Sequence, residues 1–133
     1  MKFNYQRIVA YQHVGQNLRM RTDAVVRLMQ AAAIAHSEKA GFGIDKLLKE
    51  QMGWMLFRTV VQIEQFPKYG QSFRIETWIN RYSRYKAYRC FRFFCDDHVV
   101  GEAVALYFFF NMATRQFEHV TPTLIEAFSP DPD

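Results

Sequence analysis

One long segment with a helical hydrophobic period precedes four long segments with a two-residue period, and this order restricts the fold more than any other feature of the chain. Strands of roughly eleven residues are well above the usual five or six. Turn sequences separate them, as at Pro67 to Gly70. We therefore predict one long antiparallel sheet with an additional strand at residues 4–11. The alternating segments cover residues 54–64, 73–79, 85–95 and 99–111.

The helical segment lies before the predicted sheet. From Thr22 to the residues before Gly41, apolar side chains recur at steps of three and four, after a Thr22-Asp23 start signal that predicts a capped helix. A second, short helix is expected at residues 44–51. Because the run Ala31–Ala33 lets other backbone approach closely, the sequence predicts an α+β fold in which a long curved sheet wraps around one central helix.

Length and composition indicate one domain. A chain of 133 residues with half of them apolar can bury one hydrophobic core but not comfortably two. We assign residues 1–128 to this domain and expect residues 129–133, Ser-Pro-Asp-Pro-Asp, to form a flexible tail. The thirteen Phe and seven Tyr suit the lining of a long apolar cavity.

Several classes of protein are disfavoured. No apolar run follows Lys2, so we expect no secretory signal, and the longest apolar stretch, residues 103–110, is too short to cross a bilayer. A cytoplasmic location without membrane attachment follows as an expectation. Cys90 and Cys95 lie five apart on one predicted strand and cannot pair with each other. Neither the cysteines nor the histidines show metal-ligand spacing, so we predict no metal.

Several short motifs occur in a specific order. They are Leu28 to His36 followed by Gly41-Phe42-Gly43, Trp54 to Arg58, the Pro67 turn followed by Ile75 to Trp78, and Asn111 to Arg115. Together they resemble the amino-terminal hotdog domain of the acyl-acyl carrier protein thioesterases, over nearly the whole chain. The resemblance implies a single hotdog fold, without a cofactor, that hydrolyses fatty acyl-acyl carrier protein or acyl-CoA thioesters.

The same resemblance shows two departures. Enzymes of the family carry two hotdogs in one polypeptide, which implies that a lone hotdog forms a homo-oligomer, a dimer or tetramer. The second hotdog of the family supplies an Asp-x-Asn-x-His catalytic stretch. On this chain Asn17 matches the Asn, but Gly15 stands at the Asp and Arg19 at the His. A non-catalytic module that binds acyl thioesters is therefore the alternative to a hydrolase.

Thioester hydrolysis needs a positioned water, a base and donors for the oxyanion. The polar candidates are Gln30 and His36 on the helix, His13 and Asn17 in the preceding loop, and Glu64 at the end of a strand. Each also has a structural interpretation. His36 can be a neutral, hydrogen-bonded ring among apolar neighbours, Gln30 can bond to strand backbone, and the others can be solvated.

Substrate contacts are expected at two places along the helix. Backbone N–H groups around Asp23 at the helix start could bind an oxyanion, although an ordinary capped helix start explains the same residues. Between helix and sheet, we expect Met29, Ala33, Phe57 and Phe73 to line an apolar cavity for the acyl chain.

A basic stretch interleaved with tyrosines is the strongest charge feature in a chain of net charge +4. Arg84 and Lys86 are expected to dock an acidic carrier protein by charge complementarity. A solvated strand face explains the pattern equally well. Nucleic acid is the least favoured partner, because the sequence contains no motif for binding it. The basic residues are Arg81, Arg84, Lys86, Arg89 and Arg92.

Overall fold

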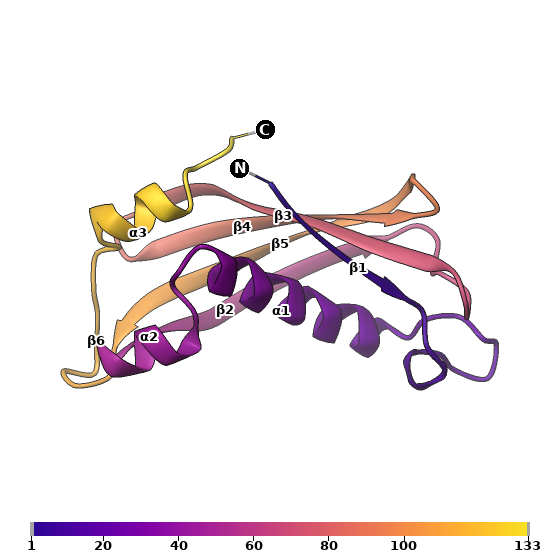
Figure 1. Ribbon diagram of the computed structural model, residues 1–133, viewed down its shortest axis with the longest axis horizontal. Coiled ribbons are helices and arrows are strands. Elements are labelled where there is room, and N and C mark those ends of the chain that lie inside the picture. Colours follow the sequence, from indigo (N-terminus) through magenta and orange to yellow (C-terminus); the bar gives the residue numbers. More distant parts are fainter. Residues whose placement is uncertain (1, 133) are drawn as a thin grey trace.

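An antiparallel sheet and one long helix make up most of the fold in the computed structural model, which describes residues 2–132 (Figure 1). The elements in chain order are β1 (Phe3–Ile8), a short 3-10 helix (Tyr11–His13), α1 (Thr22–Lys39), α2 (Ile44–Lys49), β2 (Met52–Ile63), β3 (Ser72–Ser83), β4 (Lys86–Cys95), β5 (His98–Asn111), β6 (Gln116–Phe117) and α3 (Pro122–Ala127).

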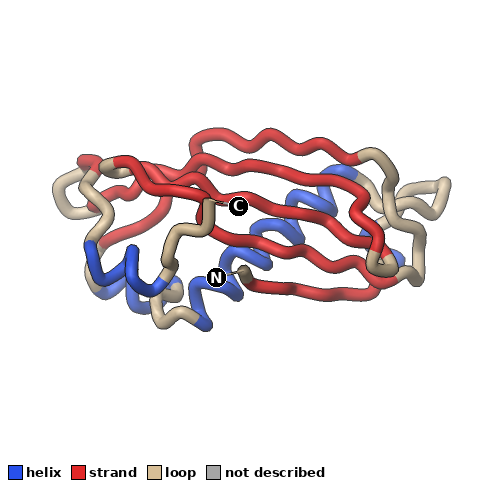
Figure 2. Tube along the Cα trace, turned by 90° about the horizontal axis from the view of Figure 1, so that it is seen from above, coloured by secondary structure: helices blue, strands red, loops and turns tan. Residues whose placement is uncertain are grey.

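The strands are ordered β1-β3-β4-β5-β2, and every pairing is antiparallel. The two-residue β6 pairs with the end of β5. Helix α1 lies against one face of the sheet and crosses the strands diagonally (Figure 2). The two outermost strands, β1 and β2, are the edges of the sheet, and β2 is the longer of the two. The observed arrangement is the one that the helical and alternating segments predicted.

The main core fills the space between α1 and the sheet. Helix α1 contributes Val25, Met29 and Ala32 at helical spacing, and the sheet contributes Phe73 and Phe93, which stack with ring centroids 5.7 Å apart. Each fully buried apolar side chain of this size stabilises the fold by roughly 1.5–3 kcal/mol. A second cluster, around Phe42, Leu47, Phe109 and Leu124, lies beneath α2 and α3.

The predicted alternation of β2 is wrong in the first half of the strand, because the strand contains a β-bulge. The pairing with β5 shifts between Leu56 and Arg58, which leaves Phe57 as the extra residue. Leu56 lies on the cavity side before the bulge, whereas the inward positions after it are Thr59, Val61 and Ile63. Phe57 is consequently 62% exposed instead of facing the helix. A bulge has this effect because one inserted residue reverses the phase of the strand.

Two helix starts differ from expectation. The residue before α1 is Arg21, and no side chain caps the helix, so the cap predicted from Thr22 and Asp23 is wrong. Helix α3 was not predicted, although its start carries a clear signal. Thr121 Oγ1 accepts a hydrogen bond from the Leu124 N–H at 3.3 Å, and Pro122 occupies the first turn.

The segment after α3 makes defined contacts over the residues that the structure describes. The Asp131 N–H donates to the Ile79 carbonyl at 2.8 Å, and Asn80 Nδ2 donates to the Pro132 carbonyl at 3.2 Å. An ion pair of 2.8 Å joins Lys2 to Asp131. These contacts hold residues 129–132, the described part of the predicted tail, close to β3.

Candidate functional site

An open apolar cavity of about 390 Å³ lies between the second half of α1, helix α2, the first half of β2 and the sheet. This volume is within the range of small-ligand pockets. Most of the lining is apolar. The lining residues are Gln30, Ala33, Ile34, Ser37, Ile44, Leu47, Leu48, Met52, Gly53, Trp54, Leu56, Ile79, Tyr82, Ala87, Arg89, Tyr107, Met112 and Phe128.

The exposure of the lining residues distinguishes a rim from a floor. Ile34, Ile44 and Leu48 are about half exposed and surround the opening. The floor consists of buried side chains, among them Ala87, Ile79 and Phe128. The opening adjoins the edge strand β2, so the cavity is accessible from outside the fold.

Arg89 is a charged residue in this mostly apolar lining and is only 5% exposed. Its Nη1 donates to Thr77 Oγ1 at 3.1 Å and to His36 Nδ1 at 3.0 Å. Burial lowers the pKa of Arg89 to about 10, an effect that Tyr107 and Tyr82 partly oppose. The guanidinium therefore remains protonated at neutral pH.

His36 is held as a neutral ring beside Arg89. It stacks on Phe3 with centroids 5.1 Å apart and meets Phe128 edge-on at 4.9 Å. Burial first, and then the positive charge of Arg89, lower the pKa of His36 from 6.5 to about 4. Because Arg can only donate, Nδ1 must be the acceptor and Nε2 carries the proton. The lone pair that a base would use is already engaged.

The position of Arg89 corrects the assignment of the basic stretch to one solvated or docking face. Along β4, Ala87, Arg89, Phe91 and Phe93 alternate with outward residues, and all four are buried. This two-residue period is visible in the sequence and places Arg89 on the inner face.

The five catalytic candidates do not converge in this chain. Gln30 borders the cavity, and His36 lies behind its floor. His13 is outside it, and its Nδ1 accepts the Ala10 N–H at 3.0 Å. Asn17 borders a separate hollow beside the start of α1, and its Oδ1 accepts the Arg19 N–H at 3.0 Å. Glu64 directly follows β2 and is exposed.

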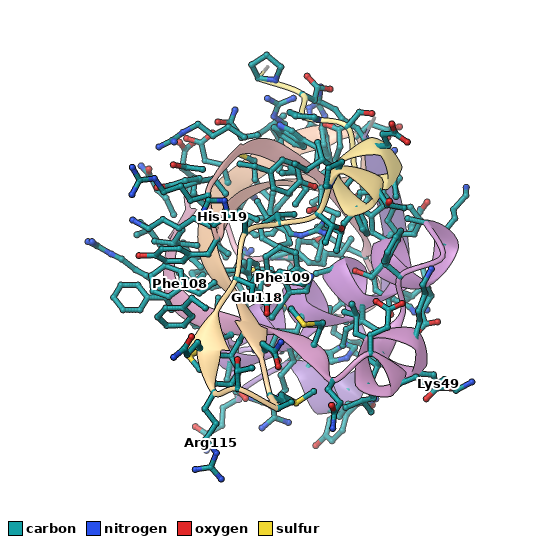
Figure 3. The ribbon with its side chains drawn as sticks, turned by 90° about the vertical axis from the view of Figure 1, so that its left-hand side faces the viewer. Lys49, Phe108, Phe109, Arg115, Glu118 and His119 are labelled. Carbon is teal, nitrogen blue, oxygen red and sulfur yellow. The ribbon has the colours of Figure 1, made fainter. Side chains whose placement is uncertain are left out.

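Of the four residues expected to line the cavity, only Ala33 does so. Met29 and Phe73 are 3% and 1% exposed and belong to the packed core between α1 and the sheet. Phe57 stacks on Phe108, with centroids 4.7 Å apart. Figure 3 shows Phe108 projecting outward while its neighbour Phe109 points into the molecule. The bulge at Phe57 and dense packing at the other two positions explain the differences.

The remaining expected contact residues lie on the surface. Asp23 pairs with Arg21 at 3.0 Å, and this hydrogen bond is the main cause of its lowered pKa. Arg84 is exposed in the turn between β3 and β4 with a left-handed φ of 56°. Lys86 Nζ lies 5.6 Å and 5.8 Å from the ring centroids of Tyr85 and Phe108. The two cationic groups thus lie at the turn between β3 and β4.

Within residues 2–132 no three His, Cys, Asp or Glu side chains are grouped in a way that could hold a metal ion. None of the described helices has the length and apolar character needed to span a membrane.

A long helix against a curved antiparallel sheet defines the hotdog class of proteins. A 1,4-dihydroxy-2-naphthoyl-CoA thioesterase from Synechocystis has a TM-score of 0.87 at 9% identity, covering 96% of this chain and 96% of that chain. An acyl-ACP thioesterase from Bacteroides thetaiotaomicron has a TM-score of 0.90 at 24% identity, covering 98% of this chain and 54% of that chain. The predicted α+β hotdog fold is confirmed.

The sequence identifies the family within this class. The chain belongs to the family described as acyl-ACP thioesterase N-terminal domain, which matches residues 1–128. The oleoyl-acyl carrier protein thioesterase 2 of Arabidopsis thaliana is 26% identical over 129 residues, which is 90% of this chain and 35% of that protein. The chain therefore spans about a third of this relative and about half of the Bacteroides protein.

Proposed function

We propose that this chain is a thioester hydrolase acting on fatty acyl-acyl carrier protein or acyl-CoA. The observation that carries the proposal is the open apolar cavity between α1 and β2 in a chain of the acyl-ACP thioesterase family. Apolar side chains favour an alkyl chain by removing it from water. A carrier protein cannot enter a cavity of about 390 Å³, so the thioester would lie near the rim.

A second copy of the chain would close the open side of the cavity. The edge strand β2 exposes apolar side chains, including Leu56 at 40% and Val60 at 56%. An open apolar edge invites pairing with another strand. We propose that a second copy pairs at this edge, in a homo-oligomer that is a dimer or tetramer.

Oligomer formation also bears on the catalytic base. The Nδ1 atoms of His13 and His36 both accept hydrogen bonds. Among the candidates this leaves Glu64, a carboxylate that forms no ion pair with the rest of residues 2–132. Glu64 lies eight residues beyond Leu56, about 26 Å along an extended strand. If β2 pairs antiparallel with β2 of a second copy, Glu64 of one copy approaches the cavity of the other. We propose Glu64 as the base and Gln30 as the group that orients water or the thioester carbonyl.

The test combines turnover with direct binding. Hydrolysis of acyl-CoA and acyl-carrier thioesters is measured across chain lengths for the wild type and Glu64→Gln, with binding of the same acyl groups followed by calorimetry. His98→Gln serves as an exposed control. We expect Glu64→Gln to lower turnover by roughly a hundredfold with binding nearly intact.

Three outcomes would change the proposal. Wild-type turnover in Glu64→Gln would remove Glu64 from catalysis. The same result for His13 and His36 variants would refute the whole candidate set. Acyl binding by the wild type without any turnover would make the chain a non-catalytic acyl-thioester-binding module. The expected cytoplasmic location stays a prediction.

A further inference from the structure

The buried guanidinium of Arg89 is not neutralised by the protein. Arg89 is 5% exposed, yet no Asp or Glu among residues 2–132 forms an ion pair with it. Its two bonds go to neutral groups, the Thr77 hydroxyl and the His36 ring. A buried charge without a counter-charge is unfavourable, because burial removes its hydration. The fold therefore retains an energetically costly cation at the floor of the apolar cavity between α1 and β2.

The guanidinium also has donors to spare. Both protein hydrogen bonds leave from Nη1, while Nε and Nη2 make none to the rest of the described chain. His36, which does not line the cavity, fixes the orientation of the group, because its Nδ1 accepts from Nη1. Arginine presents its donors in a planar fork that matches a carboxylate. Because Arg89 lines the cavity, its unused donors Nε and Nη2 are available to a ligand there.

Tyr107 adds a second polar group to the same lining. Its side chain borders the cavity from β5, and its hydroxyl bonds to no other part of residues 2–132. The Tyr82 hydroxyl, by contrast, donates to the Phe128 carbonyl at 2.9 Å. Tyr107 lies opposite Ala87 and Arg89 lies opposite Ala105, so the two side chains occupy diagonal positions on neighbouring strands and line the same cavity. An oxygen atom placed at the floor could bind both donors.

We propose that Arg89 and Tyr107 form a binding site for an oxygen-bearing far end of the acyl group, with a terminal carboxylate bound most tightly. This inference rests on the proposed function, since it assigns the acyl chain to the cavity. A methyl end would leave the donors of a buried cation unpaired, whereas a carboxylate supplies both the opposite charge and the acceptors. The preferred substrates are then half-thioesters of dicarboxylic acids.

The position of Arg89 distinguishes the far end of the ligand from its thioester. The rim residues Ile34, Ile44 and Leu48 are about half exposed, but Arg89 is buried at the floor. A carrier or coenzyme must remain outside the rim. The group that reaches Arg89 is therefore the end of the acyl chain farthest from sulfur.

The experiment uses ligands that bind but cannot be hydrolysed. Oxoalkyl coenzyme A thioethers, matched in chain length and ending in a carboxylate, a hydroxyl or a methyl group, are titrated into the wild-type protein by calorimetry. We expect the carboxylate-ended ligand to bind about ten- to hundredfold more tightly than the methyl-ended one, with the hydroxyl between them.

Variants then assign the preference to Arg89. Arg89→Met should abolish or invert it, and Arg89→Lys should keep part of it. Arg74→Met is the matched control, because Arg74 lies over Phe94 on the opposite face of the sheet and its loss removes the same charge. The control should retain the wild-type preference, and circular dichroism of each variant checks its folding.

The outcomes separate this inference from the proposed function. Equal affinity of the wild type for all three ends overturns the inference while acyl binding stands. A fall in methyl-ended acyl turnover in Arg89→Met, without a change of end-group preference, would place Arg89 at the thioester and also overturn it. No binding of any ligand refutes the acyl cavity itself. Preference for the carboxylate end without any hydrolysis supports the inference and refutes the hydrolase.

Discussion

Acidification from pH 7 to pH 5 should destabilise this protein chiefly through His36. The ring is buried, and its pKa is lowered from 6.5 to about 4, first by burial and second by the charge of Arg89. Between pH 6.5 and about pH 4, the unfolded chain binds a proton at this position and the folded chain does not. The free energy of unfolding contributed by His36 is therefore complete above about pH 6.5, falls as the pH is lowered, and is lost near pH 4.

The magnitude follows from the two pKa values. The full shift corresponds to about 3 kcal/mol at roughly 1.4 kcal/mol per pKa unit. Over the measured interval, from pH 7 to pH 5, the linkage relation gives a loss of about 2 kcal/mol. Acids with ordinary pKa values near 4 contribute little in this interval, so the histidine effect can be isolated.

Urea denaturation at pH 7 and pH 5 measures the loss directly. His36→Gln removes the titrating ring while leaving a carbonyl that can accept from Arg89 Nη1, and it should lose much less stability on acidification. His98→Gln, at an exposed position, should behave like the wild type. Equal losses in the wild type and His36→Gln, or an NMR titration that places the pKa of His36 above 6, would refute the reasoning.

Three further predictions concern the cavity, the surface and assembly. Ala33→Phe should fill part of the cavity and lower turnover of the longest accepted acyl chains by at least about tenfold relative to short ones, measured as a chain-length profile. Reversing Arg84 and Lys86 to Glu should weaken use of carrier-linked substrate much more than of acyl-CoA, with a smaller salt dependence; equal losses would exclude carrier docking at this end of the sheet. Sedimentation should show a dimer or a higher even oligomer at micromolar concentration, and Val60→Lys on the exposed edge of β2 should shift it toward the monomer.

The fold was predictable because its determinants are local. Val25, Met29 and Ala32 lie on one buried face of α1, as their helical spacing in the sequence requires. The alternation of side chains in β4 and β5 predicts which residues face inward, even when the partner strands are not known. The two-residue β6 is too short to show a period, and α3 is visible only from its Thr121-Pro122 start.

Bulges mark the limit of such local reasoning. Extending one strict alternation through β2 put Phe57 on the cavity side, but the register with β5 changes at that residue. A second shift, between Ile79 and Arg81 in β3, allows both Ile79 and Tyr82 to line the cavity although they are three positions apart. A register depends on which residues the neighbouring strand presents, and the sequence of one strand does not contain that information.

The polar cluster at the cavity floor depends on a still longer-range relation. His36 and Arg89 are separated by 53 positions and meet only because α1 crosses β4 at the required point. Taken alone, His36 allowed either a catalytic base or a neutral, hydrogen-bonded ring, and Arg89 was interpreted as a surface charge. Their contact favours the neutral ring, because donation from Arg89 occupies its lone pair, and burial beside the ring removes the arginine from the surface. What the pair can still do is offer the remaining donors of Arg89 to a ligand, and this capacity follows from the contact and not from either residue.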